Sequence, residues 1–298
     1  MGREAKDYLV NCGRVITAEE LAAIQETVAM CSGLSRSELA LTIGEHLAWY
    51  SASGSLKLDA CKKLLEKLET QGLLTLPVKQ SSSGSPRKPI PLTERTATGE
   101  PLEGILADLG AVQVVPVTEV AEVGLWNEYV QRHHYLGYQQ PFGCSLRYFI
   151  TSERGRLGCL LFSGAAKALR ERDQWLGWTP NERRRNIGLV VNNSRFLVFP
   201  WVRVKNLASH VLGQAVRRLG DDWQQRWGYR PVVVETFVDP EYYAGTCYRA
   251  ANWLYLGQTT GTGLARKGKS YTSSPKQILV LPLSADFREV LRSSEVTP

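Results

Sequence analysis

Two carboxylates four residues apart are the first candidates for chemistry in this sequence. Glu235 and Asp239 lie at the end of the apolar segment "RPVVVETFV" and before a proline. Because ligands of open α/β sheets bind at the carboxyl ends of strands, both side chains could face one cleft. They could bind Mg²⁺ there for phosphodiester chemistry, with Asp173 as a third ligand from a loop. The structural alternative is that Asp239 caps the following helix and Glu235 pairs with a buried arginine.

Histidine and tyrosine side chains extend the set of candidate catalytic groups. His133 and His134 end a predicted helix, and His134 could act as a general base near neutral pH. Tyr135, which follows them, could stack on a base. Tyr242, Tyr243 and Tyr248 lie on a predicted short helix, where a tyrosine could attack a phosphodiester. Tyrosines on such a helix more often pack and form hydrogen bonds, so a structural role stays open.

The segment "RDQWLGWTPNERRRN" combines aromatic and basic residues. Trp175 and Trp178 precede Arg183, Arg184 and Arg185. Aromatic rings beside arginines suit stacking on unpaired bases and contact with phosphates. The alternative is that the tryptophans fill the core and the arginines form a solvated rim. Other basic residues that we expect to contact DNA are Arg203, Lys205, Arg249, Arg266 and Lys267.

The overall composition is that of a globular chain with an excess of basic residues. The 298 residues carry a formal net charge of +7, which suits a polyanionic partner. The six cysteines form no CxxC pair, so a structural zinc site is not expected. There is neither a signal-peptide pattern nor an apolar run of the ~20 residues that a membrane span needs. We therefore expect a cytoplasmic protein that does not associate with membranes.

The pattern of apolar residues divides the chain into two domains and a linker. Residues 1–77 carry three helical patterns, two of them behind the capping-box spacings Thr17–Glu20 and Ser35–Glu38, and then a short strand, "LLTLP". This order is typical of a winged helix-turn-helix, and the alternative is a plain three-helix bundle. Residues 78–103 form a Ser/Pro-rich basic linker. The basic residues that would contact DNA here are Lys57, Lys62 and Lys63 in the first domain and Arg87 and Lys88 in the linker.

Residues 104–298 predict an α/β domain with a mixed sheet and flanking helices. Its element order, β-α-β-β-β-α-β-α-β-β, resembles the GNAT fold of acyltransferases. The segment from Arg203 to Ala208 resembles the loop that binds the coenzyme A pyrophosphate at a helix N-terminus, and Tyr248 stands where that superfamily often has a general acid. In both motifs an asparagine, Asn206 or Asn252, replaces glycine. Because asparagine crowds a ligand that approaches the backbone, this departure counts against coenzyme A.

Longer motifs resemble a more specific family. The segments are "HHYLGY", "RDQWLGW", "NNSRFLVFPWVRVKNLAS", "ETFVDPEYYAGTCYRAANWLYLGQTTG" and "KQILVLPL". In order and spacing they are similar to the family of the DruA protein of the Druantia anti-phage systems, whose domain also occurs fused to insertion-sequence transposases. The resemblance covers residues 126–291 and the winged-helix-like front. It implies action on or around DNA in mobile elements or in defence.

Three functions follow as expectations. The first is a DNA-binding and DNA-processing protein, a nuclease or a strand-transfer enzyme, that acts on duplex, single-stranded or hairpin DNA. The second is an acyltransferase that modifies a base or a protein. The third is a non-catalytic DNA-binding adaptor for a transposase or helicase. Among the enzymes, metal-dependent phosphodiester chemistry with Mg²⁺ is favoured over acyl transfer.

Overall fold

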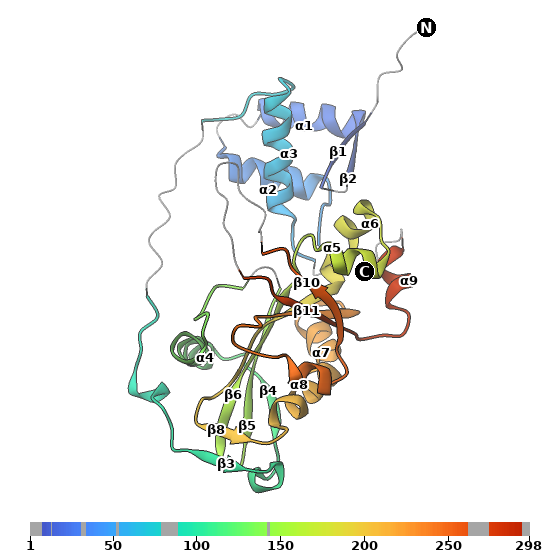
Figure 1. The fold of residues 1–298 in the computed structure, drawn as a ribbon. Coiled ribbons are helices and arrows are strands. Elements are labelled where there is room, and N and C mark those ends of the chain that lie inside the picture. The colour runs from blue at the N-terminus through green and yellow to red at the C-terminus, as the bar shows by residue number, and fades with distance from the viewer. Residues whose placement is uncertain are drawn as a thin grey trace. The chain divides into compact units, whose positions relative to one another are not determined.

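The computed structural model describes residues 8–12, 14–30, 34–51, 54–78, 89–141, 144–261 and 274–293 (Figure 1). These residues form two compact units, one up to residue 78 and the other from residue 89 onward. Four predicted DNA contacts, Arg87, Lys88, Arg266 and Lys267, lie outside the described residues and stay predictions. Within the described ranges, every helix is too short or too polar to cross a membrane.

The first unit consists of a two-stranded hairpin and three helices. Its elements are β1 (Tyr8–Asn11), β2 (Arg14–Thr17), α1 (Ala18–Met30), α2 (Arg36–His46) and α3 (Leu58–Thr70). Both predicted capping boxes are confirmed: the Glu20 amide donates to Thr17 Oγ1 (3.1 Å) and the Glu38 amide donates to Ser35 Oγ (3.3 Å). The three helices enclose an apolar core that includes Leu39, Ile43, Leu64 and Leu68.

The element order of the first unit differs from the sequence-based expectation. No strand follows α3 between residues 73 and 78; instead, Leu76 is buried in the helical core and its amide donates to Glu69 on α3. The hairpin precedes the helices. Lys57 and Lys62 are half-buried, whereas Lys63 is exposed. Burial lowers the pKa of Lys57. Contacts of these lysines with DNA stay predictions.

The second unit begins earlier than its composition suggested. Residues 89–103, expected in the linker, contain the short 3-10 helix η1 (Glu94–Thr96), and β3 (Leu102–Gly104) pairs in parallel with β8 (Val202–Val204). The buried Glu128 carboxylate accepts hydrogen bonds from the Thr93 amide and from Thr96 Oγ1 (2.7 Å). A Ser/Pro-rich composition predicts poor helix and strand formation, but it does not exclude a segment held by such tertiary contacts.

A seven-stranded mixed sheet with helices on both faces confirms the predicted α/β class. Its strand order is β10-β11-β9-β7-β6-β5-β4, and all neighbours are antiparallel except β7 and β9. The strands are β4 (Gln113–Pro116), β5 (Leu146–Ser152), β6 (Gly155–Gly164), β7 (Val190–Val198), β9 (Val233–Val238), β10 (Leu254–Gln258) and β11 (Gln277–Pro282).

Helices cover this sheet and connect its strands. Figure 1 shows α4 on one side of the sheet and α7 and α8 on the other. The helices are α4 (Val120–His133), α5 (Arg170–Leu176), α6 (Pro180–Asn186), α7 (Leu207–Trp227), α8 (Thr246–Ala250) and α9 (Phe287–Arg292), with 3-10 turns η2 (Leu106–Leu109) and η3 (Ile187–Leu189). Asp173, expected on a loop, therefore lies on α5.

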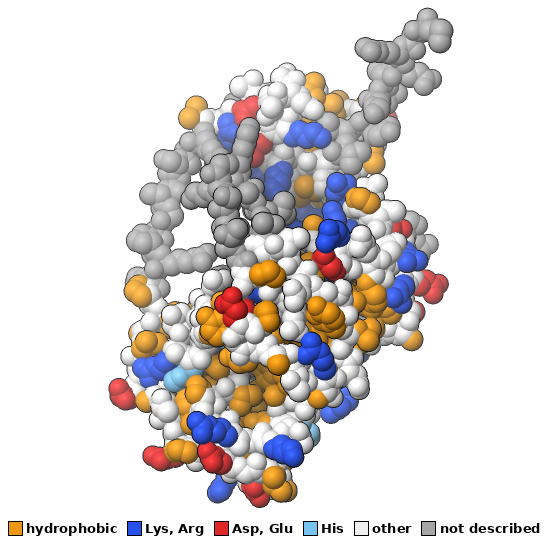
Figure 2. All heavy atoms as spheres, in the orientation of Figure 1, with side chains coloured by type: hydrophobic (Ala, Val, Ile, Leu, Met, Phe, Trp, Pro, Cys, Tyr) orange, Lys and Arg blue, Asp and Glu red, His pale blue; other side chains and the backbone are white. Residues whose placement is uncertain are grey.

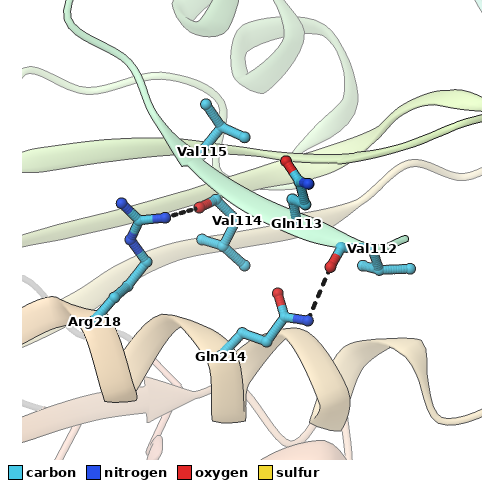
Figure 3. Close-up of a pocket in the computed structure, with 6 residues that line it drawn as sticks. All are labelled: Val112, Gln113, Val114, Val115, Gln214 and Arg218. Carbon is cyan, nitrogen blue, oxygen red and sulfur yellow. Dashed lines mark hydrogen bonds between the residues drawn. The ribbon is translucent and has the colours of Figure 1, made fainter.

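Side chains of α7 hold the edge strand β4. Gln214 donates to the Val112 carbonyl (2.9 Å) and Arg218 donates to the Val114 carbonyl (2.5 Å), across a shallow pocket (Figure 3). Arg218 also pairs with Asp222, one turn further along the helix. Because these bonds use carbonyls that an edge strand leaves open, they protect β4 from pairing with another chain.

The feature that creates the candidate site is the separation of β7 from β9. The two strands pair only from Val190 to Asn192 and from Val233 to Glu235. β7 then continues to Val198 and β9 to Val238 without pairing to each other. Since strands that diverge leave backbone and side chains unpaired between them, a cleft opens at this point of the sheet.

Candidate functional site

The cleft between β7 and β9 has a volume of about 380 Å³. Its walls come from residues 134–136 after α4, from β7 beyond Asn192, from Ala208 at the start of α7, and from the stretch that runs from the end of β9 into α8. This volume lies within the range of small-molecule sites, about 300–1,000 Å³. Of the candidate residues named from the sequence, those that line the cleft are His134, Tyr135, Asp239, Tyr243 and Tyr248.

The deep end of the cleft is a hydrogen-bonded polar network. Tyr248 Oη donates to Asn193 Oδ1 (2.7 Å), and Thr236 Oγ1 donates to the Asn193 carbonyl (3.0 Å). The side-chain nitrogen Nδ2 of Asn193 in turn donates to the Leu161 carbonyl (3.1 Å). Burial raises the pKa of Tyr248 well above its usual value. At neutral pH Tyr248 is therefore a protonated phenol whose hydrogen is already bonded, which makes it a poor nucleophile.

Three exposed tyrosines stand at the mouth of the cleft. Tyr135 is 36% exposed, Tyr242 59% and Tyr243 56%, and Tyr135 and Tyr243 line the cleft. The ring of Tyr135 lies 4.6 Å from that of Tyr242 and 5.7 Å from that of Tyr243, centroid to centroid. We call these three residues the tyrosine cluster. Figure 2 shows hydrophobic side chains exposed together on the visible face of the second unit, with basic side chains around them.

Asp239 shapes the turn that carries two of these tyrosines. Its carbonyl accepts the amides of Tyr242 (3.2 Å) and Tyr243 (2.9 Å). Its carboxylate accepts the Glu241 amide (3.2 Å) and Ser274 Oγ (2.9 Å). The helix after it, α8, begins only at Thr246, so Asp239 holds the preceding turn rather than capping a helix.

Glu235 and Asp173 belong to a buried ion-pair network outside the cleft walls. Glu235 and Arg172 are 0% exposed and pair at 2.8 Å, and Glu235 also accepts the Ala166 amide (2.8 Å). Asp173 pairs with Arg172 (2.8 Å) and with Arg183 (2.9 Å). Burial raises the pKa of Glu235, and the Arg172 charge opposes that shift. The ion-pair alternative for Glu235 is therefore what the structure shows.

The carboxylates do not converge as metal ligands. Both oxygens of Glu235 and both oxygens of Asp173 are engaged by protein donors. Across the described residues, no three His, Cys, Asp or Glu side chains are arranged to hold a metal ion. The residues of the described site thus do not offer Mg²⁺ the set of open carboxylate oxygens that it prefers.

His134 lies in the cleft as a neutral imidazole. Burial lowers its pKa to about 4, and the nearby charges of Arg195 and Lys276 add to this effect. Its Nδ1 accepts the Leu136 amide (3.2 Å), so at neutral pH the single ring proton is on Nε2. The ring stacks on Tyr135 at 4.9 Å. The adjacent His133 bonds to the Thr96 carbonyl through Nε2 (2.8 Å) and has a structural role.

The two asparagines that replace glycine adopt a glycine-like backbone. Asn206 precedes α7 with φ +63°, and Asn252 follows α8 with φ +64°. Asparagine is among the few non-glycine residues that tolerate the left-handed region. Asn206 thus supplies the left-handed residue that leads into the N-terminus of α7. Close by, Arg203 is exposed and pairs with Glu103 (3.4 Å).

The tryptophans and arginines of the segment 172–186 do not line the cleft. Trp178 is buried, and Trp175 stacks on Phe287 at 5.1 Å. Arg183 pairs with Asp173, and Arg184 donates to Asn181 (3.0 Å). Arg184 and Arg185 are exposed. This placement matches the structural alternative for Trp178. DNA contact by the partly exposed Trp175 and by the arginines stays a prediction, as it does for Lys205 and Arg249.

Sequence reasoning did not single out Asn193 and Thr236, which hold Tyr248. The available signal was the polar triplet "NNS" inside the apolar strand of β7. A polar residue in the middle of a buried strand needs a hydrogen-bond partner, and it often marks a site.

Comparison with solved structures finds acyltransferases of low similarity. Aminoglycoside acetyltransferase AAC(6')-Ib in complex with coenzyme A is 16% identical, with TM-score 0.39, and covers 61% of this chain and 100% of its own. A spermidine N-acetyltransferase SpeG chimera from Vibrio cholerae and hSSAT is 9% identical, with TM-score 0.37, and the match covers 61% of this chain and 99% of the chimera. FeeM, an N-acyl amino acid synthase from uncultured soil microbes, is 11% identical, with TM-score 0.35, and the match covers 59% of this chain and 93% of FeeM. At these TM-scores the similarity carries no argument about activity.

Comparison of sequences gives a clearer assignment. No curated protein matches the chain. The family described as Druantia protein DruA matches residues 67–273, which include β4 to β10 and every residue that lines the cleft. The match spans more than half of the 298 residues. The chain belongs to the DruA family.

Proposed function

We propose that this protein binds DNA in anti-phage defence and that the cleft between β7 and β9 receives an unpaired nucleotide. The tyrosine cluster carries the proposal. Three aromatic rings that contact one another at the mouth of a cleft, each more than a third exposed, form a surface on which bases can stack. Membership of the DruA family supports the role in defence.

Binding is favoured over metal-dependent cleavage by the state of the carboxylates. A nuclease that uses Mg²⁺ needs carboxylate oxygens open to the ion and the substrate. Glu235 and Asp173 are committed to arginines, and Asp239 to the turn that presents the tyrosines. The cleft therefore offers stacking rings and hydrogen-bond donors, which suits recognition of a nucleotide.

The test compares stacking with and without the tyrosine rings. In the variant Tyr242→Ala/Tyr243→Ala, affinity for single-stranded DNA should fall by a factor on the order of 10–100, since stacking is worth about 1–3 kcal/mol per base. Fluorescence anisotropy with labelled single-stranded, hairpin and duplex oligonucleotides measures the change. Tyr242→Phe/Tyr243→Phe keeps the rings and should retain binding.

An exposed tyrosine outside the tyrosine cluster supplies the matched control. Tyr255 on β10 is 49% exposed, lies outside the cleft, and should be replaceable by alanine without loss of affinity. Single-stranded DNA binding that is equal in the wild type and in the Tyr242→Ala/Tyr243→Ala variant would refute the proposal.

A second candidate function, acyl transfer from coenzyme A, is favoured by the start of α7. The left-handed Asn206 leads into this 21-residue helix, and Ala208 in its first turn lines the cleft. The first amides of a helix have no intrahelical acceptor and form an anion site. The same cleft would then hold the cofactor, with Tyr248 at its deep end.

Calorimetry with acetyl coenzyme A tests this candidate. Measurable binding is expected in the wild type, retained in Asn206→Gly and lost in Ala208→Asp, which places a negative charge at the helix N-terminus. Absence of heat at high protein concentration, with single-stranded DNA still bound, would exclude the cofactor.

A further inference from the structure

Arg195 on β7 is a half-buried cation that donates hydrogen bonds to two backbone carbonyls. Its Nε donates to the Gly137 carbonyl (3.1 Å) and its Nη1 to the Ser194 carbonyl (2.7 Å). Within the described ranges, no carboxylate lies within ion-pair distance of its guanidinium. The contrast with Arg172 is direct, because that arginine is fully buried and pairs with two carboxylates. Since buried charges are normally paired, a half-buried guanidinium bonded only to carbonyls is suited to binding an anionic ligand.

A second cation, Lys276, directly precedes Gln277, which pairs with Val238 of the cleft wall. The Thr259 amide donates to the Lys276 carbonyl (2.8 Å), and the Lys276 amide donates to Thr259 Oγ1 (2.9 Å), which fixes its backbone just before β11. Among the residues that the structure describes, its ammonium also has no ion-pair partner. Lys276 and Arg195 are both close enough to His134 to disfavour its protonation.

The surroundings of these two cations are otherwise neutral or already bonded. Asp239 is the one carboxylate among the residues that line the cleft, and its oxygens accept the Glu241 amide and Ser274 Oγ. His134 is neutral at pH 7 and carries its proton on Nε2. This region therefore has two positive charges, one hydrogen-bonded carboxylate and a neutral imidazole donor beside the tyrosine cluster.

We propose that Arg195 and Lys276 form an anion site that binds the phosphate of the nucleotide whose base stacks on the tyrosine cluster. The inference rests on the proposed function, and it adds a binding site for the phosphate of the stacked nucleotide. Guanidinium and ammonium groups bind phosphate oxygens through charge-assisted hydrogen bonds. The phosphate could belong to the DNA backbone or to a free nucleotide, and these two sources are separated by the probes below.

The test compares a nucleoside with its nucleotide. Dissociation constants are measured for thymidine, thymidine monophosphate and single-stranded oligothymidylate with wild type, Arg195→Gln and Lys276→Gln. In the wild type, thymidine monophosphate should bind at least about 10-fold more tightly than thymidine, as expected for hydrogen bonds to a charged group. Arg195→Gln should remove most of this preference and leave thymidine binding unchanged.

Salt dependence and a matched variant complete the design. For oligothymidylate, each lost phosphate contact should reduce the slope of log K against log salt by about 0.7. Arg226→Gln removes the same charge from an exposed site near the far end of α7, about 27 Å along the helix from Ala208, and should change neither ligand preference nor slope. If the variants reduce the salt slope for oligothymidylate and the wild type does not bind the monophosphate, the site belongs to the DNA backbone. If the wild type binds the monophosphate and the slope is unchanged in the variants, the site belongs to free nucleotides.

The anion site and the proposed function can fail separately. Arg195→Gln with an unchanged preference for the monophosphate and an unchanged slope would overturn the anion site, even where Tyr242→Ala/Tyr243→Ala abolishes binding. If the wild type binds neither thymidine nor DNA, titration with inorganic phosphate decides: a phosphate-dependent shift of the His134 ring resonances, absent in Arg195→Gln, supports the anion site. No shift in the wild type would refute it.

Discussion

Replacing Arg172 by methionine should lower the free energy of unfolding by about 3–5 kcal/mol, the cost of breaking a buried ion pair from one side. The variant leaves Glu235 fully buried with the Ala166 amide as its remaining hydrogen-bond donor. Asp173 keeps Arg183 and the Leu169 amide as donors, so most of the loss arises at Glu235. Urea denaturation followed by tryptophan fluorescence measures the change.

Two companion variants separate the ion pair from other effects. Arg170→Met, on the same helix but 70% exposed and paired with Glu171, should change stability by no more than about 0.5 kcal/mol. Arg172→Met/Glu235→Met removes both charges, and it should recover most of the loss, because an apolar pair avoids the desolvation penalty. Wild-type stability in Arg172→Met would show that the pair does not hold β9 to α5.

Replacing Gly158 by alanine should destabilise the sheet by about 1–3 kcal/mol and disturb the cleft. A Cβ at Gly158 on β6 would lie 2.1 Å from the Leu197 carbonyl oxygen on β7 and 3.0 Å from Ile150 Cδ1. The nearest obstacle is backbone, so β7 itself must move. Since β7 forms one wall of the cleft, affinity for single-stranded DNA should fall together with stability.

The matched control is another glycine to alanine change in the same unit. Gly124 is exposed within α4, and a Cβ there meets nothing within 4 Å. Gly124→Ala should therefore stabilise the protein by about 0.5–1 kcal/mol through helix propensity, with DNA affinity unchanged. Thermal and urea unfolding of both variants give the comparison, and equal stability of Gly158→Ala and wild type would contradict the predicted clash.

Local patterns in the sequence determined most of the secondary structure. The capping boxes at Thr17 and Ser35, the long helix α7 and the buried strand β9 formed as predicted, because capping and periodicity depend on neighbouring residues. The hairpin before α1 was not predicted, because each of its two strands is only four residues long and shows too little alternation of apolar and polar residues. The segment around Asp173 was predicted to be a loop, but it is the helix α5, and α6 follows it behind a capping box of Thr179 and Glu182.

The tertiary structure alone decided which candidate residues meet. Glu235 finds its counter-ion in Arg172, 63 positions earlier, and Tyr135 contacts Tyr242, 107 positions later. Their spacing predicted that Glu235 and Asp239 face one cleft. In the folded chain Glu235 forms an ion pair with Arg172, and Asp239 accepts hydrogen bonds within the turn that follows it.

The sequence by itself determined the family, the α/β class and the types of residue available for chemistry. The separation of β7 from β9, the anion site at Arg195 and the tyrosine cluster depend on which strands pair and where that pairing ends. Pairing between distant segments is set by the packing of the whole core rather than by local preference, so these features could be assigned only once the chain was folded.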